Sequence, residues 1–365
     1  MKNGLRKRVL PLLLSMVMGL SLLAGCTSNP PAPEDQSTPN DQTDITAPET
    51  PEDEPVDEPE DETPDTEQVT LHVAGLKGPT GMGMAKLMED AANGETGNTY
   101  EFTLESAPDA IVGKIVSGEL DLAAVPVNLA ATLNKKTEGN VQLAAVNTLG
   151  VLYLLTNGET VNTVEDLRGK TIYATGQGST PEYVLNYILS QNGLTVGEDV
   201  TVEYLEEHAA LASSFLAGEC AVAMLPEPFV TQVMTKSESA VLALNLTEEW
   251  EKTAGDTVLA MGGILVRRDF AEANKEAVDL FLQEYQKSVE YITDTANVDD
   301  AAALIEKFDI MPAAVAKNAL PRCNIVFLDG EEMKESAKGF LQVVFEAEPK
   351  AVGGQLPDDD FYYAS

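Results

Sequence analysis

Residues 117–126 read SGELDLAAVP, and residues 217–226, 100 positions further on, read AGECAVAMLP. The two stretches share a Gly-Glu pair, an apolar run and a closing Pro at matching positions. Each is interpreted as a helix that ends at the Gly in a left-handed C-cap, followed by a buried strand that stops where Pro cannot continue a ladder. The repeat predicts two equivalent lobes that each present a loop after the same strand, although two generic helix–strand units could also match by chance.

The sequence around the repeat alternates short apolar runs with helical patterns. Residues 120–125, 171–174, 221–225 and 258–266 are strand-like, and residues 181–190 and 274–293 have helical periodicity. This alternation predicts an α/β fold with mostly parallel sheets and helices on both faces. Ligands of open α/β sheets bind beyond the carboxyl ends of the strands, so two such edges that face each other would form a binding cleft.

The first 25 residues have the pattern of a lipoprotein signal peptide. Residues 1–8 carry four basic side chains and no acid, and an apolar run follows up to Leu23. The motif Leu-Ala-Gly-Cys at residues 23–26 resembles a bacterial lipobox. The resemblance implies cleavage before Cys26, diacylglycerol on its sulfur and a further acyl chain, such as palmitate, on its amine, which together anchor a protein durably. A plain secretory signal with an accidental Cys is the alternative.

Residues 26–68 are expected to form a disordered acidic tether. Positions 27–68 hold nine Pro and 15 Asp or Glu, with no Lys or Arg and almost no apolar side chain. Such a segment cannot offset the entropy cost of folding, and its like charges and prolines keep it extended. We expect a spacer that holds the folded body away from a membrane; a calcium-binding or partner-binding tail is the alternative.

Charge and composition argue against several classes of function. The 365 residues include 23 Lys or Arg and 60 Asp or Glu, a net charge of −37. Nucleic acid and anionic lipid surfaces both require clustered basic side chains. Two His and three Cys do not provide a zinc finger, an iron–sulfur cluster or a disulfide framework. We therefore expect no metal and no cofactor. Cys220 is expected to be a core thiol, and its pairing with Cys323 stays open.

Four features in this order along the chain resemble a bacterial solute-binding lipoprotein of an ABC importer. They are the lipobox at Cys26, VEDLRGKT at residues 164–171, GQGSTP at residues 176–181 and PEPF at residues 226–229. The resemblance is to the branch that includes nitrate, taurine, alkanesulfonate and thiamine-pyrimidine binders. It implies a bilobal periplasmic-binding-protein-like fold, in which two doubly wound sheets joined by hinge strands close over a ligand.

The resemblance also implies the domains, partners and location. Lobe 1 would comprise residues 69–157 and 255–365, and lobe 2 residues 158–254. The chain would be an extracytoplasmic, lipid-anchored monomer with no catalytic residue. It would capture a small solute, anionic or heteroaromatic, and deliver it to the permease and ATPase subunits of the importer.

Carried over onto this sequence, the resemblance places the solute site in the strand-end loops of both lobes. The N–H groups at the start of the helix after residue 179 form a ready anion site. Lys77 would neutralise an acidic ligand or lie in an exposed turn. Ser179 or Thr180 would contact the ligand or only cap the helix. Glu227 would accept from a ligand amine or bond to neighbouring backbone. The expected ligand-binding residues are Lys77, Gly78, Pro79, Thr80, Gly81, Pro126, Val127, Asn128, Thr148, Gln177, Gly178, Ser179, Thr180, Pro226 and Glu227.

An enzyme on the same scaffold, such as a dehydratase of the menaquinone route, is the alternative function. It would need a positioned acid or base between the lobes. Glu227 is the first candidate for that role and Asp109 the second. His208 has no His or Cys at metal-ligand spacing and is expected to be structural. Tyr153 or Phe229 could stack on a heteroaromatic ring, but both are expected to lie in the core.

Overall fold

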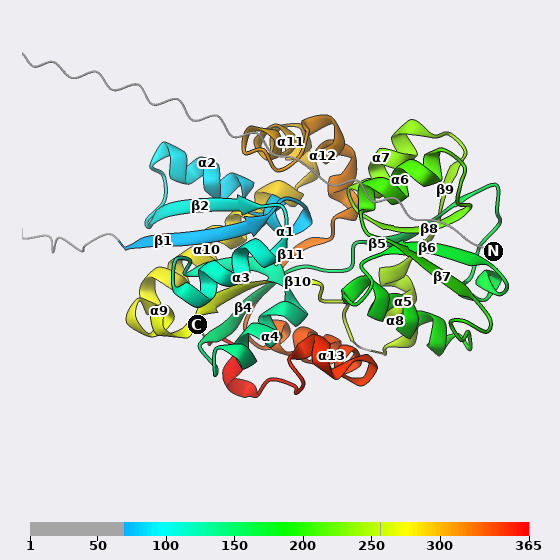
Figure 1. Cartoon of the computed structure of the whole chain (residues 1–365). Helices are drawn as coiled ribbons and strands as arrows, with labels where there is room; N and C mark the ends of the chain where they lie inside the picture. Colours follow the sequence, from blue (N-terminus) through cyan, green and yellow to red (C-terminus); the bar gives the residue numbers. More distant parts are fainter. Residues whose placement is uncertain (1–68, 256, 365) are drawn as a thin grey trace, which may run out of the picture. The chain divides into compact units, whose positions relative to one another are not determined.

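The computed structural model describes residues 69–255 and 257–364 as two mixed sheets covered by helices (Figure 1). The expected signal peptide, the lipobox Cys26 and the acidic tether lie outside the described residues. Both sheets belong to one compact unit of the chain. The α/β, two-sheet fold class predicted from the sequence is therefore confirmed.

The first sheet has the strand order β11-β4-β10-β3-β1-β2. Its strands β1 to β4 run in one direction, and β10 and β11 run against them. We call this sheet and its helices the first lobe. The strand bounds are β1 (Thr70–Leu76), β2 (Thr99–Glu105), β3 (Leu122–Pro126), β4 (Val141–Thr148), β10 (Gly262–Arg267) and β11 (Ile325–Leu328).

The second sheet has the order β7-β6-β8-β5-β9, and only β5 runs against its neighbours. We call this sheet and its helices the second lobe. Each of its strands has a counterpart in the first sheet: β6, β7, β8, β5 and β9 match β1, β2, β3, β10 and β4, in that order. Only β11 of the first sheet has no counterpart among the described strands of the second. The strand bounds are β5 (Leu152–Asn157), β6 (Thr171–Thr175), β7 (Thr201–Leu205), β8 (Val222–Pro226) and β9 (Ala240–Asn245).

The sequence repeat falls on equivalent strands, β3 and β8. In the first copy, the N–H groups of Gly118 and Glu119 donate to the carbonyls of Ile115 and Lys114, and Gly118 has a φ of 81°. Gly218 and Glu219 bond to Phe215 and Ser214 in the same pattern, and Gly218 has a φ of 78°. Each strand then ends at its Pro. The predicted helix ends and strand ends are therefore confirmed in both copies.

Helices cover both sheets, with α1 to α4 and α9 to α13 in the first lobe and α5 to α8 in the second. The helix bounds are α1 (Pro79–Met82), α2 (Ala85–Asn93), α3 (Pro108–Ser117), α4 (Val127–Lys136), α5 (Thr180–Gln191), α6 (His208–Leu216), α7 (Phe229–Lys236), α8 (Leu246–Thr253), α9 (Arg268–Ala273), α10 (Lys275–Thr293), α11 (Val298–Lys307), α12 (Ala313–Ala319) and α13 (Gly330–Ala347).

One apolar cluster continues from the first lobe into the second. It joins residues of β3, β4, α4 and α13 to residues of β5, α5 and α8. At the junction, the ring of Trp250 on α8 lies 6.1 Å from the ring of Phe340 on α13, and both side chains are fully buried. Two further clusters fill the opposite faces of the two sheets. The lobes are thus joined by shared core packing as well as by the chain.

Within the described residues, the chain passes between the sheets first through residues 149–151 and again between the end of α8 and the start of β10. β5, which follows the first passage, pairs with β8 and β9, although the expected boundary at 157 assigned these residues to lobe 1. The sequence also predicts a strand over residues 258–266, but β10 begins only at Gly262. Residues 258–261 lead into β10 as a turn, in which the Ala260 N–H donates to the Val258 carbonyl. Met261 already contacts the first lobe, since its N–H donates to the Thr148 carbonyl and its carbonyl accepts from the Val127 N–H.

Candidate functional site

The predicted solute-site residues all lie at the carboxyl ends of β1, β3 and β4 in the first sheet and of β6 and β8 in the second. Within each sheet these strands run in the same direction. In the first lobe, Lys77 to Gly81 follow β1, Pro126 ends β3 and is followed by Val127 and Asn128, and Thr148 ends β4. Gln177 to Thr180 follow β6, and Pro226 and Glu227 end and follow β8 in the second lobe. We call these five strand-end segments together the interlobe site. Their position is the one where open α/β sheets bind ligands.

Asn147, a residue that the sequence reasoning did not select, connects the segments of the first lobe. Its Nδ2 donates to the Thr80 carbonyl and to the Tyr285 hydroxyl, each at 3.0 Å. Its Oδ1 accepts from the Thr148 hydroxyl at 3.2 Å. Asn147 is fully buried, and the Cβ of any residue at position 262 would lie 2.8 Å from its Oδ1, so Gly262 leaves the space that the amide occupies.

Two predicted residues from different lobes contact each other. The Oγ1 of Thr180, at the start of α5, donates to the Oδ1 of Asn128 on α4 at 3.0 Å. The Asn128 Nδ2 is held by the carbonyl of Ala351 at 3.3 Å. Thr180 is 5 % exposed, so water competes little for this hydrogen bond. The carboxyl ends of β3 and β6 therefore meet directly.

Glu227 makes the second polar contact between the lobes. Its Oε1 accepts from the Nε of Arg322 at 2.5 Å and from the Thr231 hydroxyl at 3.0 Å, and its Oε2 accepts from the Thr231 N–H at 3.1 Å. The Glu227 side chain is fully buried and that of Arg322 is 29 % exposed. The predicted amine acceptor is thus already occupied by a guanidinium from the first lobe.

The turn before α5 departs from the expected capping. Ser179 is the N-cap residue, but its hydroxyl donates back to the Gly176 carbonyl at 2.6 Å and makes no capping bond to the helix. The Thr180 hydroxyl is used by Asn128, as described above. The N–H of Gly178 donates to the Glu182 carboxylate at 2.5 Å. The capping interpretation for the two hydroxyls is therefore wrong: each hydroxyl donates to an oxygen outside α5, and neither hydroxyl oxygen accepts a hydrogen bond from a first-turn N–H group.

The cations at the interlobe site are paired with carboxylates. The Lys77 ammonium lies 2.5 Å from the Asp309 carboxylate, just after α11, and Arg322 is paired with Glu227 as above. Each pair sums to zero charge. A solute would therefore meet hydrogen-bond donors of these pairs rather than a strong field of net positive charge.

His208 lies at the carboxyl end of the second sheet, at the start of α6. Its Nδ1 lies 2.5 Å from the Thr175 hydroxyl, and its ring lies 5.2 Å from the ring of Phe229. Burial lowers the pKa of His208 below its usual value of 6.5, which favours the neutral ring. Tyr153 is 3 % exposed and its hydroxyl donates to the Arg322 carbonyl at 2.9 Å. Both aromatic groups are engaged within the protein.

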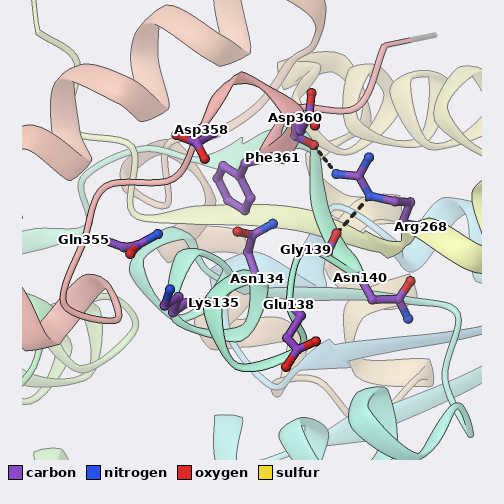
Figure 2. Close-up of a pocket in the computed structure, with 10 residues that line it drawn as sticks. All are labelled: Asn134, Lys135, Glu138, Gly139, Asn140, Arg268, Gln355, Asp358, Asp360 and Phe361. Carbon is purple, nitrogen blue, oxygen red and sulfur yellow. Dashed lines mark hydrogen bonds between the residues drawn. The ribbon is translucent and has the colours of Figure 1, made fainter.

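A cavity of about 540 Å³ lies elsewhere, on the first lobe (Figure 2). Arg268 closes one side by donating to the carbonyls of Gly139 and Asp360, at 2.9 and 2.7 Å. None of the predicted solute-site residues lines it. The lining residues are Asn134, Lys135, Glu138, Gly139, Asn140, Arg268, Gln355, Asp358, Asp360 and Phe361.

Neither a cluster of metal-ligating side chains nor a disulfide is found in the part of the chain that the structure describes. No group of three or more His, Cys, Asp or Glu among residues 69–255 and 257–364 could hold a metal ion. Cys220 and Cys323 are both buried and both free, so the disulfide between them is not formed. No described helix has the length and apolar character needed to cross a bilayer.

Arg322 and Asn147 are the main site residues that sequence reasoning missed. Arg322 lies 95 positions from Glu227, and neither residue belongs to a motif that links them. Asn147 follows an apolar run in the sequence of β4. The one sequence signal that could have marked it is an amide side chain at a position where the strand is expected to be buried, because a buried amide needs hydrogen-bond partners.

Comparison with known proteins gives consistent results. Residues 85–319 match the family described as ABC transporter, phosphonate, periplasmic substrate-binding protein. No curated protein matches the sequence. Among solved structures, an ABC transporter protein from Parabacteroides distasonis is 23 % identical with a TM-score of 0.68, covering 81 % of this chain and 99 % of that one.

Two further solved structures have the same fold. The periplasmic aliphatic sulphonate binding protein of Escherichia coli is 17 % identical with a TM-score of 0.65, covering 81 % of this chain and 92 % of that one. The periplasmic nitrate-binding protein of Synechocystis PCC 6803 is 13 % identical with a TM-score of 0.56, covering 78 % and 84 %. At these identities the likeness concerns the fold.

Proposed function

The chain belongs to the family of ABC-transporter phosphonate periplasmic substrate-binding proteins, and from that premise we propose that it captures a small solute bearing an oxyanion group. As a member of this family, it is the solute-binding component of an ABC importer. The solute would bind at the interlobe site, and the two passages between the sheets would act as the hinge that closes the lobes over it. The closed form would then present both lobes to the permease.

The observation that carries this proposal is the meeting of the two sets of strand ends. The Thr180–Asn128 hydrogen bond and the Arg322–Glu227 ion pair each join the carboxyl end of one sheet to that of the other. Hydroxyl, amide and guanidinium donors are gathered there from both lobes. Donors of this kind recognise the oxygens of phosphonate, sulfonate or nitrate groups.

An oxyanion is a better candidate than a heteroaromatic ring because of what the aromatic side chains already do. The Tyr153 ring is buried and its hydroxyl is bonded to Arg322. Phe229 is paired with His208. A stacking solute would have to displace one of these contacts, whereas an oxyanion could share the donors of Arg322 or the strand-end loops.

We infer that binding occurs without a chemical step. The carboxylate of Glu227, which the enzyme alternative would use as a base, is fully buried and accepts three hydrogen bonds from Arg322 and Thr231. A general base needs an open lone pair directed at the substrate. Asp109 lies exposed in the first turn of α3, without a partner that would set it up as an acid or a base.

The test is a binding panel on the purified chain. Thermal shift and calorimetric titration would compare methylphosphonate, ethanesulfonate, taurine and nitrate with uncharged thiamine-pyrimidine analogues. We expect at least one oxyanion to bind with a 1:1 stoichiometry, and saturation at 100 times Kd to stabilise the fold by about 2.7 kcal/mol. Binding of the uncharged analogues alone would refute the proposed solute class.

We also propose that the mature chain is anchored through a lipidated Cys26. The proposal is supported by the lipobox sequence and by the family's location outside the cytoplasm. Mass spectrometry of the N-terminal peptide from membrane-extracted protein should find Cys26 as the first residue with acyl chains attached. Release of a Cys26→Ser variant into the medium is the expected companion result, and an unmodified Cys26 in the intact chain would contradict it.

A further inference from the structure

The segment Arg322 to Asn324, just before β11, holds the second lobe at several points. Besides the bond from Arg322 Nε to Glu227, Arg322 Nη2 donates to the Thr231 hydroxyl at 2.5 Å. The Arg322 carbonyl accepts from the Tyr153 hydroxyl at 2.9 Å. All three partners lie on the second lobe, although the segment itself leads into a strand of the first.

The same segment also holds the first passage between the sheets. The Asn324 Nδ2 donates to the Gly150 carbonyl at 2.5 Å, and the Asn324 carbonyl accepts from the Leu149 N–H at 2.9 Å. The N–H of Glu227 in turn donates to the Val151 carbonyl at 3.0 Å. The segment therefore bonds to the hinge and to the lobe beyond it.

The base of this segment is fixed in the first lobe. The side chain of Cys323 is fully buried in the apolar cluster that β1, β10 and α10 form, so the backbone between Arg322 and Asn324 cannot swing freely. Arg322 Nη2 also donates to the Asn318 carbonyl on α12 at 3.1 Å. The guanidinium is thus aimed from a rigid first-lobe support at a buried carboxylate of the second.

We propose that Arg322 is a positioning residue for solute binding, which clasps Glu227 across the lobes and thereby favours the closed arrangement that holds the solute. The expected effect of Arg322 on solute affinity rests on the proposed function, whereas its expected effect on the distance between the lobes does not. Opening the lobes would separate Arg322 from Glu227 and leave a buried carboxylate without its counter-ion. That loss disfavours the open form even before a solute arrives.

The consequence for affinity follows from the population of the closed form. When the competent form is only a fraction of the protein, the apparent Kd rises by the inverse of that fraction. A substitution that lowers the population of the closed form would therefore weaken solute binding, even if the substituted residue does not contact the solute. We expect about a tenfold rise in Kd or more on removing one partner, because the other charge is left unpaired.

The experiment measures the lobes and the affinity separately in the purified full chain. Spin labels at Val116→Cys and Val241→Cys report the distance between the lobes, because these side chains are 58 % and 56 % exposed and lie one on each lobe. Cys26 is replaced by Ser in all the labelled chains, and the native thiols of Cys220 and Cys323 are buried, which protects them from labelling. Distances are recorded without solute and with the tightest oxyanion of the panel.

The informative variants are Arg322→Lys, which keeps the charge but loses the two-point contact, and Glu227→Gln, which keeps the shape but loses the charge. Glu227→Gln should lengthen or broaden the solute-free interlobe distance and raise Kd about tenfold, and Arg322→Lys should have the same two effects at smaller size. The double variant should be no worse than Glu227→Gln alone, as expected for partners in one interaction. Arg168→Lys is the matched control, since Arg168 pairs with Asp199 inside the second lobe and should change neither quantity.

Thr231→Val is a milder variant if the charge variants fold poorly. It removes only the hydroxyl between Glu227 and Arg322, and the same two effects are expected at smaller size. An unchanged solute-free distance in all three variants would overturn the clasp, even with a raised Kd, because Arg322 would then act on the solute directly. Longer distances in a chain that binds no oxyanion would support the clasp and refute the proposed function instead.

Discussion

Replacing Thr180 with Val tests the contact between the strand ends of the two lobes. Valine has nearly the shape of threonine, so the packing around this 5 % exposed residue should be kept. The lost group is the hydroxyl that donates to Asn128 Oδ1 at 3.0 Å. A hydrogen bond removed in this way, with one partner left unpaired, costs about 1–2 kcal/mol. That is a factor of about 5–30 in an equilibrium constant.

Because the hydrogen bond crosses between the lobes, its loss should affect solute binding as well as stability. Urea unfolding gives the change in the free energy of unfolding, and calorimetric titration gives the change in Kd. Thr235→Val is the matched control, since the Thr235 hydroxyl donates to the Thr231 carbonyl within α7. We expect only Thr180→Val to weaken solute binding. Equal Kd values for the two variants and the wild type would refute the role assigned to the Thr180–Asn128 contact.

Three further results are expected. Phe340→Ala should lower the free energy of unfolding by about 3–5 kcal/mol in one transition, because this buried ring belongs to the core that both lobes share; two separate urea transitions would contradict a shared core. Gly81→Ala should abolish solute binding, because its Cβ would lie 2.2 Å from the Leu76 carbonyl oxygen, whereas Gly113→Ala, at an exposed position of α3, should leave Kd unchanged. A wild-type Kd for Gly81→Ala would contradict this. Because burial lowers the pKa of His208 in the folded chain, the unfolded chain takes up this proton at a higher pH. His208 therefore contributes stability above about pH 6.5 that is lost as the pH falls through its folded-state pKa. Urea unfolding of His208→Gln should be less acid-sensitive than that of the wild type, and an equal sensitivity would contradict this.

Local sequence signals were sufficient for the repeat and its two strands. The Gly at each helix end, the apolar run and the closing Pro act within ten residues, so the features around Gly118 and Gly218 could be read without knowing the rest of the fold. The carboxyl-end loops followed from the same strands, because the direction of a strand fixes where its loop lies.

Contacts between distant segments could not be predicted in this way. Arg322 stands in a short, irregular stretch before β11, and nothing near it in the sequence indicates Glu227 as its partner. The same holds for the hydroxyl of Ser179, which a motif assigns to the helix but the turn directs to the Gly176 carbonyl. The late start of β10 depends on the turn that leads into it, whose contacts with the first lobe are a property of the whole fold.

Hydrogen exchange with and without the tightest-binding oxyanion tests the central claim most directly. If the two lobes close over the solute, exchange should slow together in the loops after β1 and β3 and in those after β6 and β8. The cavity beside Arg268 in Figure 2 should remain unaffected. Protection confined to one lobe, or centred on that cavity, would contradict capture between the lobes.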